Sequence, residues 1–149
     1  MQILEYQSLY QQNLLSYKLH LPREQVPAVI RHMLNNIESL GIKPAGKIIF
    51  TEDIYQYKNI EILIPVDKSF ASCEQFEKKP AFRLINAVSA RHEGDFSALE
   101  KTEQKLLQVI RERACQMITV PYYNIIRLDP ENLSSTIIDI YIGINYNLL

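Results

Sequence analysis

Tryptophan is absent from this chain of 149 residues, which also has only two cysteines and four glycines. The two cysteines, Cys73 and Cys115, cannot form a disulfide framework. No CxxC pair and no pair of histidines at helical spacing indicates a metal site. We therefore expect a fold that is stabilised by an ordinary hydrophobic core, with no metal and no cofactor.

An excess of charge of either sign is also lacking, since the formal net charge is -1 and the isoelectric point is about 6.3. This balance does not predict direct binding to nucleic acid or to an anionic membrane. No apolar run approaches the roughly 20 residues that span a bilayer. The first six residues contain no basic segment of the kind that begins a signal peptide. We expect a cytoplasmic location.

Two segments of the chain repeat the same pattern. Residues 59–67 and 138–145 each contain an acidic residue, then alternating aliphatic residues, then Pro or Gly. Both are rich in residues that favour strands. Because internal repetition at long range indicates a duplicated unit, we predict that the chain has two similar halves.

A helix is predicted ahead of each of these strands. Residues 26–40 carry apolar side chains at the three- and four-residue spacing of an amphipathic helix, and Gly41 follows in the position of a C-cap. Residues 96–114 carry a similar stripe, and Asp95 or Ser97 can cap its start. Each half thus contains one main helix.

Further strands are predicted on both sides of each helix. Their ranges are 14–21 and 47–52 in the first half, and 81–91 and 121–128 in the second half. Residues 3–10 extend the first strand through a bend near 11–13. The order is therefore strand, helix, strand, strand, twice over.

The fold class predicted from this order is α+β, with a single domain over residues 1–149. The first half covers about 1–67 and the second about 81–149, joined by a mostly polar connection at 68–80. Neither half alone can cover both its sheet and its helix, so we expect one antiparallel sheet with both helices on one face. A pseudo-twofold arrangement would leave a central cleft for a ligand.

Four stretches resemble a known family. Residues 92–99 resemble a His-x-Gly-x-Tyr-x-x-Leu helix entry, and 123–130 resemble a strand that ends in Asp-Pro; the strands at 61–66 and 139–144 resemble the pair that closes each half. Together they resemble the GyrI-like effector-binding domain, found in the DNA gyrase inhibitory protein and in the drug-sensing half of some bacterial transcription activators. The resemblance spans nearly the whole chain.

This resemblance implies a cleft that accepts apolar, often cationic, small molecules against a buried carboxylate beside aromatic rings. At the position where the resemblance implies that glutamate the chain has Asn124, and the nearby aromatic position is Ile126. No helix-turn-helix segment precedes the domain in these residues. A role in transcription would therefore act through a partner.

The candidate ligand-binding residues are tyrosines and strand carboxylates on or near the predicted sheet: Tyr55, Glu61, Tyr123, Asn124, Asp139 and Tyr141. A tyrosine ring offers a flat apolar face with a hydroxyl, which suits a ligand cage, although packing on the sheet explains a tyrosine equally well. Glu61 and Asp139 occupy matching positions, so a twofold could bring both to the cleft. The alternative is that each is a solvated residue at the start of its strand.

Two other classes of function stay open beside ligand binding. His92 and Glu93 could form the acid–base pair of a hydrolase, but neighbours on a strand point to opposite faces, and no nucleophile elbow or phosphate loop is present; we expect no enzyme activity. A protein-interaction module, as monomer or homodimer, could use Phe70 and Phe76 as contact points. Alternatively, these two rings tuck under the connection as part of the core.

Overall fold

The computed structural model describes residues 1–53, 56 and 58–146. Within these ranges the chain forms an antiparallel sheet, two α-helices and three short 3-10 turns. The elements, in chain order, are β1 (Ile3–His20), η1 (Arg23–Gln25), α1 (Val26–Ser39), β2 (Ile49–Glu52), β3 (Asn59–Pro65), β4 (Glu77–Glu93), η2 (Phe96–Ala98), α2 (Leu99–Glu112), β5 (Cys115–Met117), β6 (Tyr122–Arg127), η3 (Leu133–Ser135) and β7 (Ile137–Tyr146).

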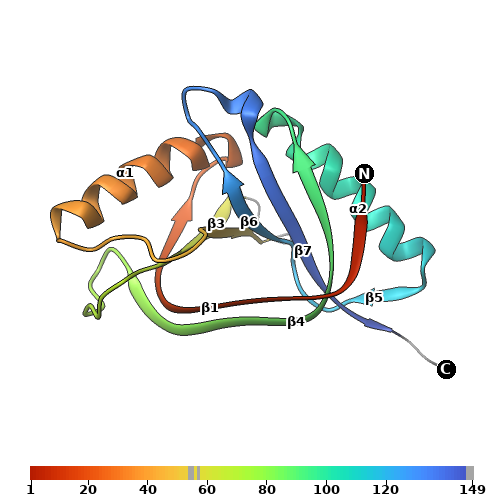
Figure 1. Cartoon of the computed structure of the whole chain (residues 1–149), viewed down its shortest axis with the longest axis horizontal. Coiled ribbons are helices and arrows are strands. Elements are labelled where there is room, and N and C mark those ends of the chain that lie inside the picture. The colour runs from red at the N-terminus through yellow and green to blue at the C-terminus, as the bar shows by residue number, and fades with distance from the viewer. Residues whose placement is uncertain (54–55, 57, 147–149) are drawn as a thin grey trace.

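The strands follow the order β4-β1-β3-β2-β6-β7-β5, and β4 also pairs with β7, so the sheet closes on itself. The long strands β1 and β4 pair with each other along most of their length. Their middle parts run side by side along the bottom of Figure 1 and their ends turn up toward the other strands, while α1 and α2 lie in the upper part of the view. The predicted α+β class, with both helices on one face of one antiparallel sheet, is confirmed.

The register of the sheet confirms the duplication. β1 pairs Lys18 with Glu61 of β3, and β4 pairs Arg91 with Asp139 of β7. Along the chain, β1 and β4 are each followed by a 3-10 turn and then by an α-helix of 14 residues. The two strand–helix–strand–strand halves therefore correspond residue by residue over much of their length.

Both long strands bend at an asparagine. Asn13 of β1 and Asn86 of β4 have φ values of 55° and 57°, in the left-handed region. The Asn13 Nδ2 group donates hydrogen bonds to the carbonyl oxygens of Val66 at 2.8 Å and Lys68 at 3.0 Å. Asn86 Nδ2 donates to the carbonyl of Ile144 at 3.3 Å. Asparagine tolerates this conformation better than most residues, and the bend expected near 11–13 is confirmed.

Both helices bury the apolar side chains whose three- and four-residue spacing predicted them. α1 and α2 pack on a core that includes strand residues at every second position, such as Ile60, Ile62 and Ile64 of β3. Gly41 follows α1 with a φ of 76°, as a C-cap glycine should, and Ala114 takes the same place after α2 with a φ of 55°. No helix among the described residues is long and apolar enough to cross a membrane.

Two element boundaries differ from the prediction. β4 begins at Glu77, within the segment expected to be the connection. This polar start of the strand is extended because it pairs with β1. The helix predicted over 96–114 ends at Glu112, and Cys115 begins the short strand β5, which pairs with the end of β7. The left-handed Ala114 just before it turns the chain out of α2.

The connection between the halves is packed against the core. Phe76 is buried, and its ring centroid lies 5.6 Å from that of Tyr17 and 5.5 Å from that of Phe70. Phe70 is itself partly buried against the main core. Of the two interpretations of these phenylalanines, the structure supports packing under the connection.

Candidate ligand-binding cleft

A cleft of about 540 Å³ opens on the helix side of the sheet, where η1 of the first half faces α2 of the second half. Its volume lies within the range of small-molecule sites. Much of its wall is apolar: Pro22, Phe96, Leu107, Met117 and Pro121. The two halves build it together, since η1 and β2 come from the first half and α2 comes from the second.

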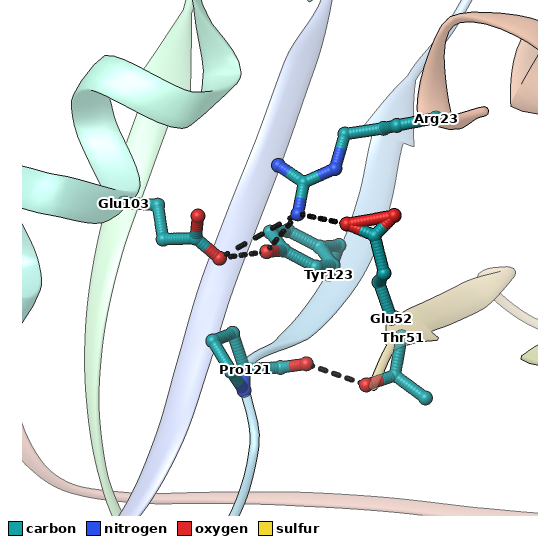
Figure 2. A network of polar contacts seen from close by, with 6 residues as sticks. All are labelled: Arg23, Thr51, Glu52, Glu103, Pro121 and Tyr123. Atoms are coloured by element: carbon teal, nitrogen blue, oxygen red, sulfur yellow. Dashed lines mark hydrogen bonds and ion pairs between the residues drawn. The ribbon is translucent and has the colours of Figure 1, made fainter. Parts of the chain in front are cut away.

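A network of polar side chains forms the floor of this cleft (Figure 2). The Tyr123 hydroxyl donates a hydrogen bond to Glu103 and accepts one from Arg23 Nη2 at 2.9 Å. The same Nη2 lies 3.2 Å from a carboxylate oxygen of Glu52 and 3.7 Å from one of Glu103. These groups come from β6, α2, η1 and β2, so the network ties four elements together.

Aromatic rings support the network from below. Tyr123 is 1% exposed and stacks on Phe50, with ring centroids 4.6 Å apart and an interplanar angle of 18°. The Arg23 guanidinium carbon lies 4.9 Å from the Tyr123 ring centroid, which is a cation–π distance. Phe50 and Tyr123 are register partners of β2 and β6, where the two halves meet. Two buried aromatic rings therefore lie beneath the charged groups that line the cleft.

The charge states of the network follow from burial and from its neighbours. Burial, together with Glu103, raises the pKa of Tyr123 well above its usual range, so the hydroxyl stays protonated. Burial alone would lower the pKa of Arg23, but Tyr123, Glu103 and Glu52 outweigh that effect and raise it. Two carboxylates therefore face one permanent cation.

The rim of the cleft adds further negative charge. Glu24, Glu100 and Lys58 are the exposed charged residues that line it. The described residues that line the cleft thus include four glutamates but only two cationic side chains. A concave surface lined mostly by one sign of charge concentrates ligands of the opposite sign.

The residues predicted for the site divide between the two faces of the sheet. Tyr123 lies directly beneath the cleft, in contact with residues that line it. Tyr55 falls outside the described residues. The remaining four residues point to the opposite face of the sheet, because successive side chains of a strand alternate between its two faces. They are Glu61, Asn124, Asp139 and Tyr141. The prediction that these residues meet Tyr123 in one cleft is wrong.

Glu61 and Asp139 are equivalent, as predicted, but the twofold does not bring them together. Glu61 accepts a hydrogen bond from Ser16 at 2.6 Å and pairs with Lys79 at 2.8 Å. Asp139 accepts two hydrogen bonds from Arg91, at 2.8 and 3.0 Å. Strands β2 and β6 lie between the two carboxylates. Each carboxylate has a cation of its own, and both cations come from β4: Lys79 for Glu61 and Arg91 for Asp139.

Asn124 stands where the GyrI-like resemblance implies a ligand carboxylate. Its side chain is buried on the face away from the helices, and its Oδ1 atom has no hydrogen-bond partner among the described residues. The carboxylates that do reach the cleft are Glu103 of α2 and Glu52 of β2.

Sequence reasoning missed Arg23, Glu52 and Glu103. For Glu103 a signal was present, since it falls between Leu99 and Leu106 on the buried stripe of α2. A carboxylate in a core position requires a buried partner. Arg23 and Glu52 carried no such signal, because one lies in a short turn and the other at the end of a short strand.

His92 is part of the scaffold that supports α2. Its Nδ1 atom lies 2.7 Å from the Thr102 hydroxyl and its Nε2 atom lies 2.9 Å from the carbonyl of Asp95. The carbonyl can only accept, so Nε2 donates to it, and in the neutral ring Nδ1 accepts from the Thr102 hydroxyl. Glu93 is exposed on the other face of β4, so these neighbours do not form an acid–base pair. No cluster of three or more His, Cys, Asp or Glu side chains within the described ranges could hold a metal ion.

Comparison with known sequences finds no match, either among protein-family models or among curated proteins. Solved structures do match. The EcmrR chain in a cryo-EM complex with DNA superposes with a TM-score of 0.72 at 14% identity, over 94% of this chain and 57% of EcmrR. The crystal structure of the EcmrR C-terminal domain gives a TM-score of 0.67 at 16% identity, over 94% of this chain and 98% of that domain.

A hydrolase from Listeria innocua also shares the architecture, with a TM-score of 0.55 at 10% identity, over 97% of this chain and 91% of the hydrolase. The chain therefore has the fold of the EcmrR C-terminal domain, and the GyrI-like resemblance is confirmed at the level of the fold. The chain spans little more than half the length of EcmrR itself.

Proposed function

We propose that this chain is a small-molecule binding domain whose cleft between η1 and α2 holds an apolar organic cation. The observation that carries the proposal is the floor of the cleft, where Glu52 and Glu103 flank the Arg23 cation, which lies over the Tyr123 ring. Two carboxylates share this one arginine, so the arginine alone does not balance their charge, and a positively charged occupant is favoured. The apolar walls, which include Phe96 and Met117, provide surface for the rest of the ligand.

The same geometry favours binding over catalysis. The raised pKa of Tyr123 keeps its hydroxyl protonated, and both carboxylates are engaged with Arg23. The GyrI-like resemblance independently implies effector binding, and the fold shared with the EcmrR C-terminal domain is consistent with it. A role in sensing a ligand, rather than in transforming it, is the function that these features support best.

Thermal shift with two ions of one shape tests this proposal. Tetraphenylphosphonium and tetraphenylborate have similar size and apolar surface but opposite charge. The cation should raise the melting temperature, because a ligand that binds the native state stabilises it, and the anion should not. Equal shifts for both ions, or no shift for either, would contradict the proposal.

Matched variants on α2 locate the effect. Glu103→Gln keeps an oxygen that can accept from Tyr123 but removes the charge, and should reduce the shift caused by tetraphenylphosphonium. Glu112→Gln alters an exposed carboxylate at the other end of the same helix and should leave it unchanged. A shift that survives Glu103→Gln intact would place the cation elsewhere.

A further inference from the structure

The duplication shows which charges the fold itself does not need. η1 begins with Arg23, whereas the equivalent turn η2 begins with the buried Phe96. The fifth residue of α1 is the buried Ile30, whereas the fifth residue of α2 is Glu103. An apolar residue serves at each position in one half, so the charged residue in the other half is not a requirement of the architecture. The two departures meet as one ion pair in the cleft.

Among the described residues of the cleft floor, the groups that would attract a ligand cation are the two carboxylates and the Tyr123 ring. The Arg23 guanidinium already contacts all of them. Its Nη2 atom contacts the Tyr123 hydroxyl at 2.9 Å, Glu52 at 3.2 Å and Glu103 at 3.7 Å, and its central carbon lies 4.9 Å from the centroid of the Tyr123 ring. A ligand cation that used the same carboxylates and the same ring face would need the space that Arg23 fills.

We propose that Arg23 is an internal competitor, which fills the cation subsite of the ligand-free cleft and is displaced when a ligand cation binds. This inference rests on the proposed function of the cleft. Arg23 would then decide which cations bind, because a ligand must bind more strongly than the guanidinium that it replaces.

The position of Arg23 allows it to leave without unfolding the domain. It lies on η1, a turn of only three residues, and its side chain lines the cleft. Its side chain is 19% exposed, so one edge already reaches solvent. Rotation of the long side chain toward Glu24, on the exposed rim, would empty the subsite while the backbone of η1 stays in place.

This mechanism defines the class of ligand. A tethered group competes at an effective concentration on the order of millimolar, so a small cation that merely replaces one guanidinium by another gains nothing. The ligand must add apolar contacts that Arg23 cannot make, to walls such as Phe96, Leu107 and Met117. A delocalised cation joined to an apolar body fits these requirements, because its charge can lie over the Tyr123 ring as the guanidinium does.

Removal of the competitor provides the test, with benzamidine and methylguanidine as probes. In Arg23→Ala, benzamidine should bind about tenfold more tightly or better than in the wild type, as measured by isothermal titration calorimetry. Methylguanidine should raise the melting temperature of Arg23→Ala but not that of the wild type, since it replaces the missing group. Arg31→Ala, which removes an exposed arginine of α1 paired with Glu131, should behave as wild type.

A measurement on the unaltered protein complements the variant. The NMR signal of the Arg23 Nε–H group should shift when saturating tetraphenylphosphonium is added, while that of Arg31 should not. If the ligand binds and the Arg23 signal does not change, or if Arg23→Ala binds benzamidine no better than the wild type, the inference is wrong and the proposed function stands. If no cation binds either protein, the proposed function fails as well.

Discussion

At the scale of single residues, the most informative side chain is Tyr123, which is almost completely buried yet carries a polar group. Its hydroxyl both donates to Glu103 and accepts from Arg23, so neither capacity is left unused. Its ring stacks on Phe50 and supports the guanidinium above it. One residue therefore serves the core of the domain and the floor of the cleft.

Tyr123→Phe should reduce stability at neutral pH by about 1–3 kcal/mol, because it leaves buried partners of the hydroxyl unsatisfied. Urea denaturation monitored by circular dichroism measures this loss. Tyr10→Phe, on an exposed ring of β1, should cost much less. Equal effects of the two substitutions would mean that the hydroxyl network adds little to stability.

The pH dependence of stability provides a separate prediction for Tyr123. Its pKa is raised in the folded state above the ordinary value of 10.0, so the folded protein keeps a proton that the unfolded chain loses. The corresponding stability is fully present below pH 10.0 and is lost as the pH rises above it. Tyr123→Phe should therefore lose stability less steeply than the wild type in alkaline urea titrations; an unchanged slope would contradict the burial of this group.

At the scale of elements, the ends and bends of helices and strands depend on a few residues with positive φ. Gly41 and Ala114 leave α1 and α2 in the same left-handed conformation, although only glycine adopts it without steric cost. Asn13 and Asn86 bend β1 and β4 in the same way. The two members of each pair occupy equivalent positions in the two halves, so substitutions at one can be compared with substitutions at the other.

Exchanging glycine and alanine after the helices should change stability in opposite directions. Ala114→Gly should stabilise by about 0.5–1 kcal/mol, since it relieves a strained backbone. Gly41→Ala should destabilise by about 1 kcal/mol; a Cβ atom there would meet nothing within 4 Å, so the cost is conformational. Thermal unfolding of both variants measures these changes, and a stabilising Gly41→Ala would show that the left-handed turn is not maintained in solution.

Substitutions at the strand bend separate its hydrogen bonds from its backbone conformation. Asn13→Ala removes two side-chain hydrogen bonds and adds strain, and should cost about 2 kcal/mol; Asn13→Gly removes the bonds alone and should cost about 1 kcal/mol. Asn86→Ala should cost less than Asn13→Ala, because its amide makes a single, longer bond. Denaturation midpoints in guanidinium would reveal this order. The reverse order for the two alanine variants would contradict the structure.

At the scale of the whole molecule, the two halves share one sheet and one main core. β1 pairs with β4 and β2 pairs with β6, so strands of the first half are completed by strands of the second. The cleft divides in the same way, with Arg23 and Glu52 from the first half and Glu103 and Tyr123 from the second. Neither the core nor the cleft is complete in one half.

The chain should therefore unfold in a single cooperative transition, and its first half should not fold alone. Circular dichroism and tyrosine fluorescence should report the same midpoint for residues 1–149. A fragment of residues 1–67 should show no cooperative transition and should bind no tetraphenylphosphonium. Two resolved transitions, or a folded fragment, would show that the halves are independent domains.

The sequence alone determined the order and type of most elements, because periodicity and end signals act locally. The stripes of α1 and α2, the glycine after α1 and the alternating strands β3 and β7 all appeared where these patterns predicted them. The duplication was also visible, since it repeats the same local signals. The polar start of β4 and the short β5 carried no local signal, and pairing with β1 and β7 made them strands.

Only the tertiary structure decided the composition of the cleft. Side chains of a strand alternate between faces, so a difference of one position separates Tyr123 beneath the cleft from Asn124 on the opposite side. Glu103, Glu52 and Arg23 come from three elements that the fold brings within ion-pair distance. A sequence shows that a charge occupies a buried stripe, but its partner depends on which distant segments pack against it.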